Sequence, residues 1–245
     1  VYKRQGLIPT SGDLDGITHL LSTIPPTTEG HDPVLTHLGS QLKEQSLTWV
    51  GYLSTTGVYG DQQGRWVSED DPANPGQPRS QRRHACEQAW LDSGLPVQIL
   101  RLPGIYGPGR SVLDSLRTGT ARRILKADQV FCRIHVDDIA GACLHLMHQA
   151  TAGQWPAIVN VSDDCPAAPQ DLLRYGAALL NCELPNEEPF ELASRSMSAM
   201  ARSFWSENRR VRNTLLCQQL GYALLHTDFK AGLQDCLRQE SQSCS

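Results

Sequence analysis

Apolar runs alternate with helical repeats over the first hundred residues of the chain. Residues 17–24 (ITHLLSTI) form a short apolar run that ends at a Pro-Pro pair, as expected of a strand buried on both faces. Residues 33–45 follow with apolar side chains at helical spacing, and Asp32 precedes them as a candidate N-cap. The next elements are a strand over residues 47–54, a helix over 79–93 that Gly94 ends, and a strand over 95–102. Crossovers of this length predict parallel strands and therefore an α/β sheet.

Shorter elements follow beyond residue 105, where Gly and Pro interrupt the pattern. The expected helices cover residues 111–119, 137–149, 169–180, 207–220 and 229–238, and the expected strands cover 130–134 and 157–161. Asp137 is the expected N-cap of the second of these helices. His135, just before it, is expected to be a structural histidine whose ring nitrogens are hydrogen-bonded.

The composition is that of an ordinary globular protein, with 40% hydrophobic and 20% charged residues. The net charge of −4 gives no basic surface for nucleic acid, and no apolar run approaches a membrane span, so neither partner is expected. The eight Cys contain no CxxC pair and no signal peptide precedes them, so we expect reduced thiols in a cytoplasmic protein. His145 and His148 are spaced as a helical pair but lack a carboxylate partner, so no metal site is expected.

Three segments, each at or just after a predicted strand, carry the candidate chemistry. They are Leu53–Gly60 (LSTTGVYG), Arg101–Gly109 (RLPGIYGPG) and Arg133–Ala140 (RIHVDDIA). In an open parallel sheet, ligands bind at the carboxyl ends of the strands. The order and spacing of these segments resemble the extended short-chain dehydrogenases, and among them the atypical NAD-dependent epimerase/dehydratase-like proteins. The resemblance implies an α/β fold with a Rossmann-like, doubly wound parallel sheet and a small C-terminal substrate-binding region.

The resemblance also implies a division of the chain. It places the Rossmann-like domain at residues 1–105 and 127–162, and the substrate-binding region at 106–126 and 163–245. The family's glycine-rich loop, GxxGxxG, cradles the dinucleotide pyrophosphate, and the glycines that precede residue 17 do not have its spacing. We therefore expect a sheet that lacks its first strands, in a chain truncated at its N-terminus.

Individual residues at these strand ends acquire roles from the resemblance. Thr55 matches the family's catalytic Ser/Thr, whose hydroxyl orients the reacting oxygen of the substrate. The family's catalytic Tyr-x-x-x-Lys pair falls on Arg79 and Arg83 when the helix is aligned on Glu87. Arg83 can still donate hydrogen bonds to a ribose, whereas Arg79 cannot act as a general acid because a guanidinium keeps its proton. Two tyrosines after strand ends remain open as substitutes, or as residues that pack the turns beside the site: Tyr59 and Tyr106.

The other implied contacts are to a cofactor, NAD or NADP, and to a small-molecule substrate. The implied cofactor-binding residues are Thr23, Ile24, Pro25, Thr55, Arg83, Pro103, Gly104 and Ile105. The implied substrate-binding residues are Thr56, Tyr59, Tyr106 and Arg110. The expected function is that of an NAD(P)-dependent oxidoreductase or epimerase acting on a nucleotide-sugar or another carbinol. The alternative is a non-catalytic, dinucleotide-binding regulatory protein that has lost the Tyr/Lys pair, and a homodimer is left open in either case.

Overall fold

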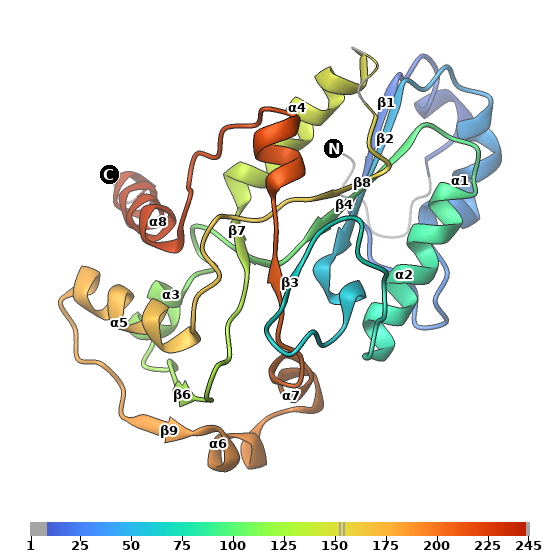
Figure 1. The fold of residues 1–245 in the computed structure, drawn as a ribbon. Helices are drawn as coiled ribbons and strands as arrows, with labels where there is room; N and C mark the ends of the chain where they lie inside the picture. The colour runs from blue at the N-terminus through green and yellow to red at the C-terminus, as the bar shows by residue number, and fades with distance from the viewer. Residues whose placement is uncertain (1–8, 152, 154, 244–245) are drawn as a thin grey trace.

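A parallel four-stranded sheet forms the centre of the protein. The computed structural model describes residues 9–151, 153 and 155–243. The sheet consists of β1 (His19–Ser22), β2 (Trp49–Thr55), β4 (Val97–Leu102) and β8 (Ile158–Asn160), in the order β1-β2-β4-β8 (Figure 1). Every neighbouring pair is parallel, with Leu53 opposite Leu100 and Leu100 opposite Val159. The parallel α/β sheet expected from the sequence is confirmed.

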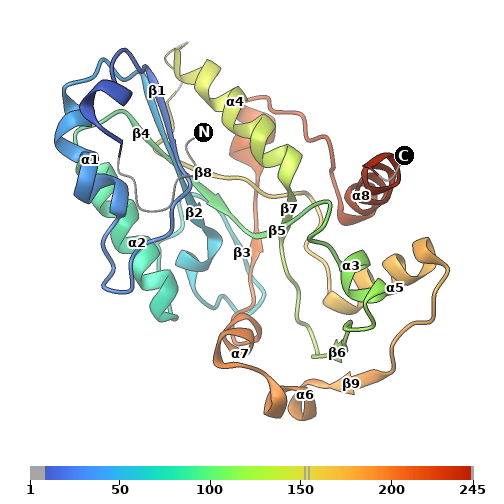
Figure 2. The ribbon, with the colours of Figure 1, turned by 180° about the vertical axis from the view of Figure 1, so that it is seen from behind.

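Helices cover both faces of this sheet. Helices α1 (Pro33–Lys43) and α2 (Pro78–Leu91) lie on one face, and α4 (Val136–Thr151) lies on the other (Figures 1 and 2). Strand β4 has apolar side chains on both faces of the sheet. Ile99 packs in the core under α1 and α2, and Leu100 packs in the core under α4. Successive strand side chains point to opposite faces, so one apolar strand supplies both cores.

Smaller elements extend beyond the carboxyl ends of the sheet. Three parallel strand pairs are β5 (Gly104–Tyr106) with β7 (Arg133–His135), β6 (Arg123–Leu125) with β9 (Glu187–Pro189), and β3 (Trp66–Val67) with β10 (Arg210–Val211). The other helices are α3 (Val112–Arg117), α5 (Pro169–Leu180), α6 (Phe190–Ser196), α7 (Ala199–Trp205) and α8 (Phe229–Ser243). Short helical segments are η1 (Ser11–Asp13), η2 (Thr56–Tyr59) and η3 (Leu215–Gln219). In both ribbon views β6, β9, α6 and α7 lie together at one end of the molecule (Figures 1 and 2).

No helix in the described part of the chain has the length and apolarity needed to cross a membrane.

The helix predicted over residues 207–220 is wrong. This stretch contains the two-residue strand β10 and a single π-helical turn, η3. The Arg210 and Arg212 N–H groups donate to the carbonyls of Arg65 and Val67, at 2.9 and 2.8 Å. Backbone donors that a helix would use are therefore bonded to the segment around β3.

The start of α4 also differs from the prediction. The helix begins at Val136, so Asp137 lies in its first turn and is not the N-cap. The Asp137 N–H donates to Nδ1 of His135 at 3.3 Å. A histidine side chain therefore satisfies the Asp137 N–H, one of the backbone donors in the first turn that have no partner within the helix. The preceding strand is Arg133–His135, where residues 130–134 were expected.

The proposed division into two domains stays a prediction. Leu216 and Leu220, from the predicted substrate-binding region, pack in the same apolar core as Val159 of β8. The C-terminal part of the chain therefore helps to bury the face of the sheet under α4.

Asp32 holds α1 to α2, and replacing it with Ala should destabilise the fold. Its Oδ1 accepts the N–H groups of Val34 and Leu35 at 2.9 and 3.0 Å, and its Oδ2 accepts the Trp90 indole N–H at 3.0 Å. Loss of the cap and of the buried indole partner should lower the free energy of unfolding by about 2–3 kcal/mol. Urea unfolding measures this. Asp32→Asn keeps an oxygen for the cap and should cost less, so an equal cost for both variants would contradict the assignment.

Candidate functional site

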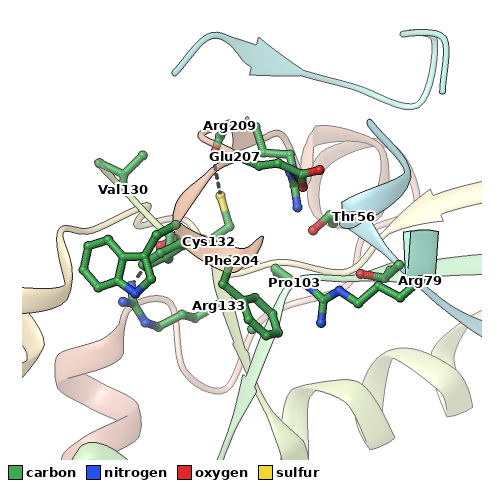
Figure 3. A pocket seen from close by; sticks show the side chains of 13 residues that line it. Thr56, Arg79, Pro103, Val130, Cys132, Arg133, Phe204, Glu207 and Arg209 are labelled. Carbon is green, nitrogen blue, oxygen red and sulfur yellow. Dashed lines mark hydrogen bonds and ion pairs between the residues drawn. The ribbon is translucent and has the colours of Figure 1, made fainter. Parts of the chain in front are cut away.

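A cavity of about 330 Å³ opens at the carboxyl ends of β2 and β4 (Figure 3). The first half of the chain lines it with Thr55, Thr56, Arg79, Pro103 and Gly104. The second half lines it with Val130, Phe131, Cys132, Arg133, Phe204, Trp205, Glu207 and Arg209. This edge is where parallel α/β sheets bind ligands, so the cavity is the candidate site.

Thr55 presents a hydroxyl to this cavity. Its Oγ1 accepts the Gly57 N–H at 3.1 Å as the N-cap of η2. The hydroxyl hydrogen can then be donated to a ligand oxygen. A Cβ on Gly57 would come within 2.7 Å of Oγ of Ser80, so the close approach of η2 to α2 requires glycine here. This approach brings Thr55 and Arg79 to the same cavity.

Arg79 lies at the start of α2 with its guanidinium stacked on an aromatic ring. The guanidinium carbon is 3.7 Å from the centroid of the Phe204 ring. Within the described residues, the Arg79 side chain has no hydrogen-bond or ion-pair partner. Burial lowers the pKa of Arg79, and the charge of Glu207 opposes that shift. A guanidinium remains charged despite such a shift, so Arg79 brings a cation with uncommitted N–H donors to the cavity.

Glu207 and Arg209 line the cavity from the segment after α7. Oε2 of Glu207 accepts from Nη1 of Arg209 at 2.7 Å, and this Nη1 also donates to the Gly60 carbonyl at 2.8 Å. Oε1 of Glu207 is buried without a hydrogen-bond partner in the described structure. A buried acceptor left unpaired costs free energy, so the ion pair with Arg209 is what holds the Glu207 carboxylate in the cavity wall.

Cys132 lines the cavity but is not a candidate nucleophile. The Val211 N–H donates to its Sγ at 3.2 Å. Burial raises the pKa of the Cys132 thiol to about 11, so the thiol is protonated at neutral pH. The described cysteines are all free thiols, in agreement with the expectation from the sequence.

A buried ion pair lies behind the cavity and joins α2 to the sheet. Glu87 is fully buried, and its two carboxylate oxygens accept from Nε and Nη2 of Arg101 at 3.1 and 2.8 Å. Oε1 of Glu87 also accepts the hydroxyl of Ser54, the residue before Thr55. The pair therefore fixes the end of β2 that carries the Thr55 hydroxyl.

The comparison with protein families assigns the chain. The model of the NAD dependent epimerase/dehydratase family matches residues 29–162. The chain belongs to this family. Protein YeeZ of Escherichia coli (strain K12) is 30% identical over 191 residues, which cover 73% of this chain and 66% of that protein. The match thus spans just under two thirds of this curated relative.

Solved structures agree with this family assignment. A functionally unknown conserved protein from Silicibacter pomeroyi DSS is 42% identical, with a TM-score of 0.87 over 96% of this chain and 81% of that chain. The dTDP-glucose 4,6-dehydratase of Bacillus anthracis, in complex with NAD, is 17% identical, with a TM-score of 0.70 over 92% of this chain and 73% of that chain. At that identity the second likeness shows the fold alone. The Rossmann-like α/β fold expected from the sequence is confirmed.

The two arginines predicted to stand at the family's Tyr and Lys positions, Arg79 and Arg83, have different surroundings in this chain. Arg79 lines the cavity, whereas Arg83 does not. Nη1 of Arg83 donates to the Tyr52 hydroxyl at 3.0 Å, to the Leu53 carbonyl at 3.2 Å and to the Ile24 carbonyl at 3.4 Å. Arg83 therefore ties the end of β2 to the exposed segment after β1.

The implied cofactor contacts form a row along this edge of the sheet. Thr23, Ile24 and Pro25 follow β1 and are exposed. Pro103 and Gly104 line the cavity after β4, and the adjacent Ile105 packs partly against the core under α4. The row thus runs from β1 past Arg83 and Thr55 to the turn after β4, and its role in binding a cofactor stays a prediction.

Of the implied substrate residues, only Thr56 is among those that line the cavity in the described structure. Tyr59 is buried, and its hydroxyl donates to Oδ1 of Asn160 at 2.9 Å. Tyr106 packs edge-on against His135 at 5.2 Å between ring centroids, and burial raises its pKa as it does that of Tyr59. Arg110 lies in an exposed turn. The structure does not bring these three to Thr55, so a role for either tyrosine as the missing proton donor has no geometric support.

A second polar cluster lies away from the cavity, where α8 meets the start of α4. Ligand-type atoms of His135, Asp137, His226 and Asp235 all lie within 4.8 Å of one another, although the sequence suggested no metal site. The His135 and His226 rings are in contact, with centroids 4.0 Å apart and planes tilted by 42°, and Nδ1 of His226 is 2.9 Å from Oδ2 of Asp138. Nε2 of His226 is also 3.3 Å from Oδ2 of Asp235, so the cluster joins α8 to the segment before it and to the start of α4. No local sequence pattern indicates that these two histidines meet, because 91 positions separate His135 from His226.

Asp163 predicts a dependence of stability on pH. Burial raises its pKa to about 8, against opposing contributions from the Cys165 N–H and Arg133. The unfolded side chain loses its proton near pH 4, so between about pH 4 and 8 the folded state holds the extra proton and stability falls as the pH rises. Asp163→Asn removes this fall and should raise the free energy of unfolding at pH 8 by about 2 kcal/mol relative to wild type, with little gain at pH 5.

Thermal unfolding at the two pH values measures this effect, and Asp164→Asn at the exposed neighbouring position controls for the loss of one charge. A gain for Asp163→Asn that is equal at pH 5 and pH 8 would contradict the assignment.

Proposed function

We propose that this epimerase/dehydratase is an NAD-dependent oxidoreductase or epimerase that holds its substrate at the Thr55 cavity. One observation carries the proposal: Thr55, the turn at Pro103 and Gly104, and Arg79 line a single cavity at the carboxyl edge of the sheet. The substrate would be a nucleotide-sugar or another small molecule with a carbinol carbon. The family assignment and the NAD bound to the Bacillus anthracis dehydratase support the class of cofactor.

The residues present fit the nicotinamide side of a dinucleotide. The exposed end of β1 and the Arg83 guanidinium offer a surface and N–H donors beside β2, and the turn after β4 closes the cavity. When bound, the nicotinamide would supply the hydride acceptor or donor. Thr55 would orient the substrate oxygen, and the Arg83 donors would face the ribose. NAD is the better supported cofactor, and binding of NADP as well stays a prediction.

The alternative is a regulatory protein that binds the dinucleotide without turnover. It is favoured by one observation: among the described residues that line the cavity there is no Tyr or Lys, and Arg79 lines it where the resemblance predicts the Tyr. A guanidinium does not deliver a proton at neutral pH. An active enzyme would therefore take its proton from the substrate or from solvent.

Two measurements separate these functions. The complete gene product that contains residues 1–245 is titrated with NADH and NADPH by fluorescence, and turnover is then followed over a panel of nucleotide-sugars. We expect saturable NADH binding together with turnover of at least one carbinol substrate. Binding without turnover would favour the regulator, and binding of neither cofactor would contradict both functions.

A cytoplasmic location and a homodimer also stay proposals, and size-exclusion chromatography tests the homodimer.

A further inference from the structure

We propose that a cluster of two histidines and two aspartates binds a Zn²⁺ ion that clamps helix α8 to the start of α4. Its members are His135, Asp137, His226 and Asp235, and one ligand-type atom from each lies within 4.8 Å of the others. Imidazole nitrogens and carboxylate oxygens are ligands that Zn²⁺ takes in proteins. None of the four side chains lines the Thr55 cavity, so this inference is independent of the proposed function.

The hydrogen bonds of His226 direct one ring lone pair into the cluster. The Asp138 carboxylate is fully buried, and its Oδ2 lies 2.9 Å from Nδ1 of His226, so Nδ1 is the ring nitrogen that carries the hydrogen. Nε2 is then unprotonated in the neutral ring, and it faces Oδ2 of Asp235 at 3.3 Å. Two acceptors thus face each other, and a cation between them removes their repulsion. A carboxylate behind a ligating imidazole is the usual arrangement around zinc in proteins.

His135 also presents an unprotonated nitrogen to the cluster. Its Nδ1 accepts the Asp137 N–H at 3.3 Å, while its Nε2 lies 3.6 Å from Sγ of Cys236. The neutral ring therefore carries its hydrogen on Nε2 and a lone pair on Nδ1. Oδ2 of Asp137 lies 3.6 Å from this Nδ1. A hydrogen bond of 3.3 Å is a long one, so the ion competes with a weak partner for the lone pair.

The spacing of these atoms suits a tetrahedral ion. Zinc lies about 2.0–2.1 Å from nitrogen and carboxylate oxygen, so neighbouring ligand atoms of a tetrahedral site are about 3.3 Å apart. The two nitrogen–oxygen pairs of the cluster are 3.3 and 3.6 Å apart, close to that separation. Nε2 of Gln239 donates to Oδ2 of Asp137 at 3.1 Å and to Oδ2 of Asp235 at 2.7 Å. The ion takes over the same two oxygens from these N–H groups.

The charge and the exposure of the cluster fit a divalent cation. Asp137 and Asp235 contribute two negative charges, and the two neutral rings contribute none. Arg238 donates to Oδ1 of Asp235, which leaves Oδ2 directed at the cluster. The Asp137 side chain is 44% exposed, whereas the other three ligand side chains are at most 10% exposed. An ion therefore enters beside Asp137 and meets ligands that are already buried.

The origin of the ligands indicates a structural role. His135 ends β7, and Asp137 lies in the first turn of α4. His226 lies in the segment before α8, and Asp235 lies in α8 itself. Four protein ligands close a zinc site, whereas catalytic zinc keeps a position open for water or substrate. The ion therefore holds the C-terminal helix in place and adds to the stability of the fold.

Zinc binding by the complete gene product tests the proposal. The protein is treated with EDTA, dialysed and titrated with ZnCl₂ by calorimetry in a buffer that does not chelate metals. We expect one equivalent of Zn²⁺ per chain with a Kd of about 1 μM or lower. The melting temperature should rise by about 5 °C when free Zn²⁺ is about 100 times the Kd. MgCl₂ should give no rise, because Mg²⁺ prefers oxygen ligands to imidazole.

Variants with matched controls assign the binding to the cluster. Asp137→Asn removes the most exposed ligand and should weaken Zn²⁺ binding by about 10- to 100-fold, whereas Asp70→Asn changes an exposed aspartate elsewhere and should not. His226→Gln should abolish the zinc-induced rise in melting temperature. His148→Gln, at an exposed position in the last turn of α4, should leave that rise unchanged.

Cobalt distinguishes this site from zinc bound by the cysteines. Co²⁺ in the cluster should give the visible bands of a tetrahedral ion and no charge-transfer band from a thiolate. A thiolate band, unchanged Zn²⁺ binding in Asp137→Asn, a rise with MgCl₂ equal to that with ZnCl₂, or absence of saturable Zn²⁺ binding would each overturn the proposal. If His226→Gln does not fold, as judged by its melt without metal, Asp137→Asn still decides.

Discussion

Replacing Glu87 with Gln is expected to lower the free energy of unfolding by about 3–5 kcal/mol, because the change leaves the buried Arg101 guanidinium without its counter-charge. Both side chains are buried, and Arg101 donates two hydrogen bonds to the Glu87 carboxylate. Arg101 has a further neighbour in the Tyr59 ring, 4.7 Å from the guanidinium carbon, but a ring face does not replace a carboxylate. Differential scanning calorimetry should show a melting temperature lower by about 10 °C.

Two comparisons make the Glu87 result specific. Glu183→Gln makes the same change at an exposed position and should stay within about 0.5 kcal/mol of wild type. The double variant Glu87→Leu with Arg101→Met removes both charges and should cost less than Glu87→Gln alone. A double variant that loses as much as the sum of its single changes would show that the two side chains do not act as a pair.

Asp138→Asn is the second change with a large expected effect, about 3 kcal/mol. The Asp138 carboxylate is fully buried and accepts the N–H groups of Leu225 and His226 at 2.7 and 3.0 Å, as well as Nδ1 of His226 at 2.9 Å. An amide at this position would point N–H groups at one or more of these donors. Urea unfolding measures the cost, and hydrogen exchange should show lost protection at the amides of Leu225 and His226.

The neighbouring Asp137 provides the matched control for Asp138. Its side chain is 44% exposed, although the two residues adjoin in the same first turn of α4. Asp137→Asn should therefore cost less than about 1 kcal/mol. Equal costs for the two variants would contradict the assignment of Asp138 as the residue that holds the segment before α8.

The elements predicted well from the sequence are those whose apolar spacing is decided locally. Helix α5 has the predicted bounds, 169–180, because Pro169 marks its start and one apolar face runs along it, and α1 begins after the predicted cap Asp32. The stretch 207–213 was predicted as part of a helix over residues 207–220. Its true conformation depends on pairing with β3, about 140 positions earlier, and no local pattern records that pairing.

The residues of the candidate site that were predicted are those that follow β2 and β4 or begin α2. Thr55, Thr56, Pro103, Gly104 and Arg79 follow from strand ends and from the family resemblance, and they line one cavity. Phe204, Trp205, Glu207 and Arg209 were missed as site residues, because they reach the cavity from α7 and the segment after it. No local pattern marks Glu207 as a site residue, because an acidic residue before an Arg run is typical of a solvated helix face.

The central claim, that the carboxyl edge beside Arg83 and Thr55 holds the cofactor, is tested most directly by NADH titration of two neighbouring variants. Arg83→Gln removes the donors that lie between the ends of β1 and β2, whereas Arg82→Gln removes the same charge one position earlier on α2. The account predicts saturable NADH binding to the complete gene product, weakened about 10-fold by Arg83→Gln and unchanged by Arg82→Gln. Absence of saturable binding in the wild type, or equal affinities in the two variants, would contradict it.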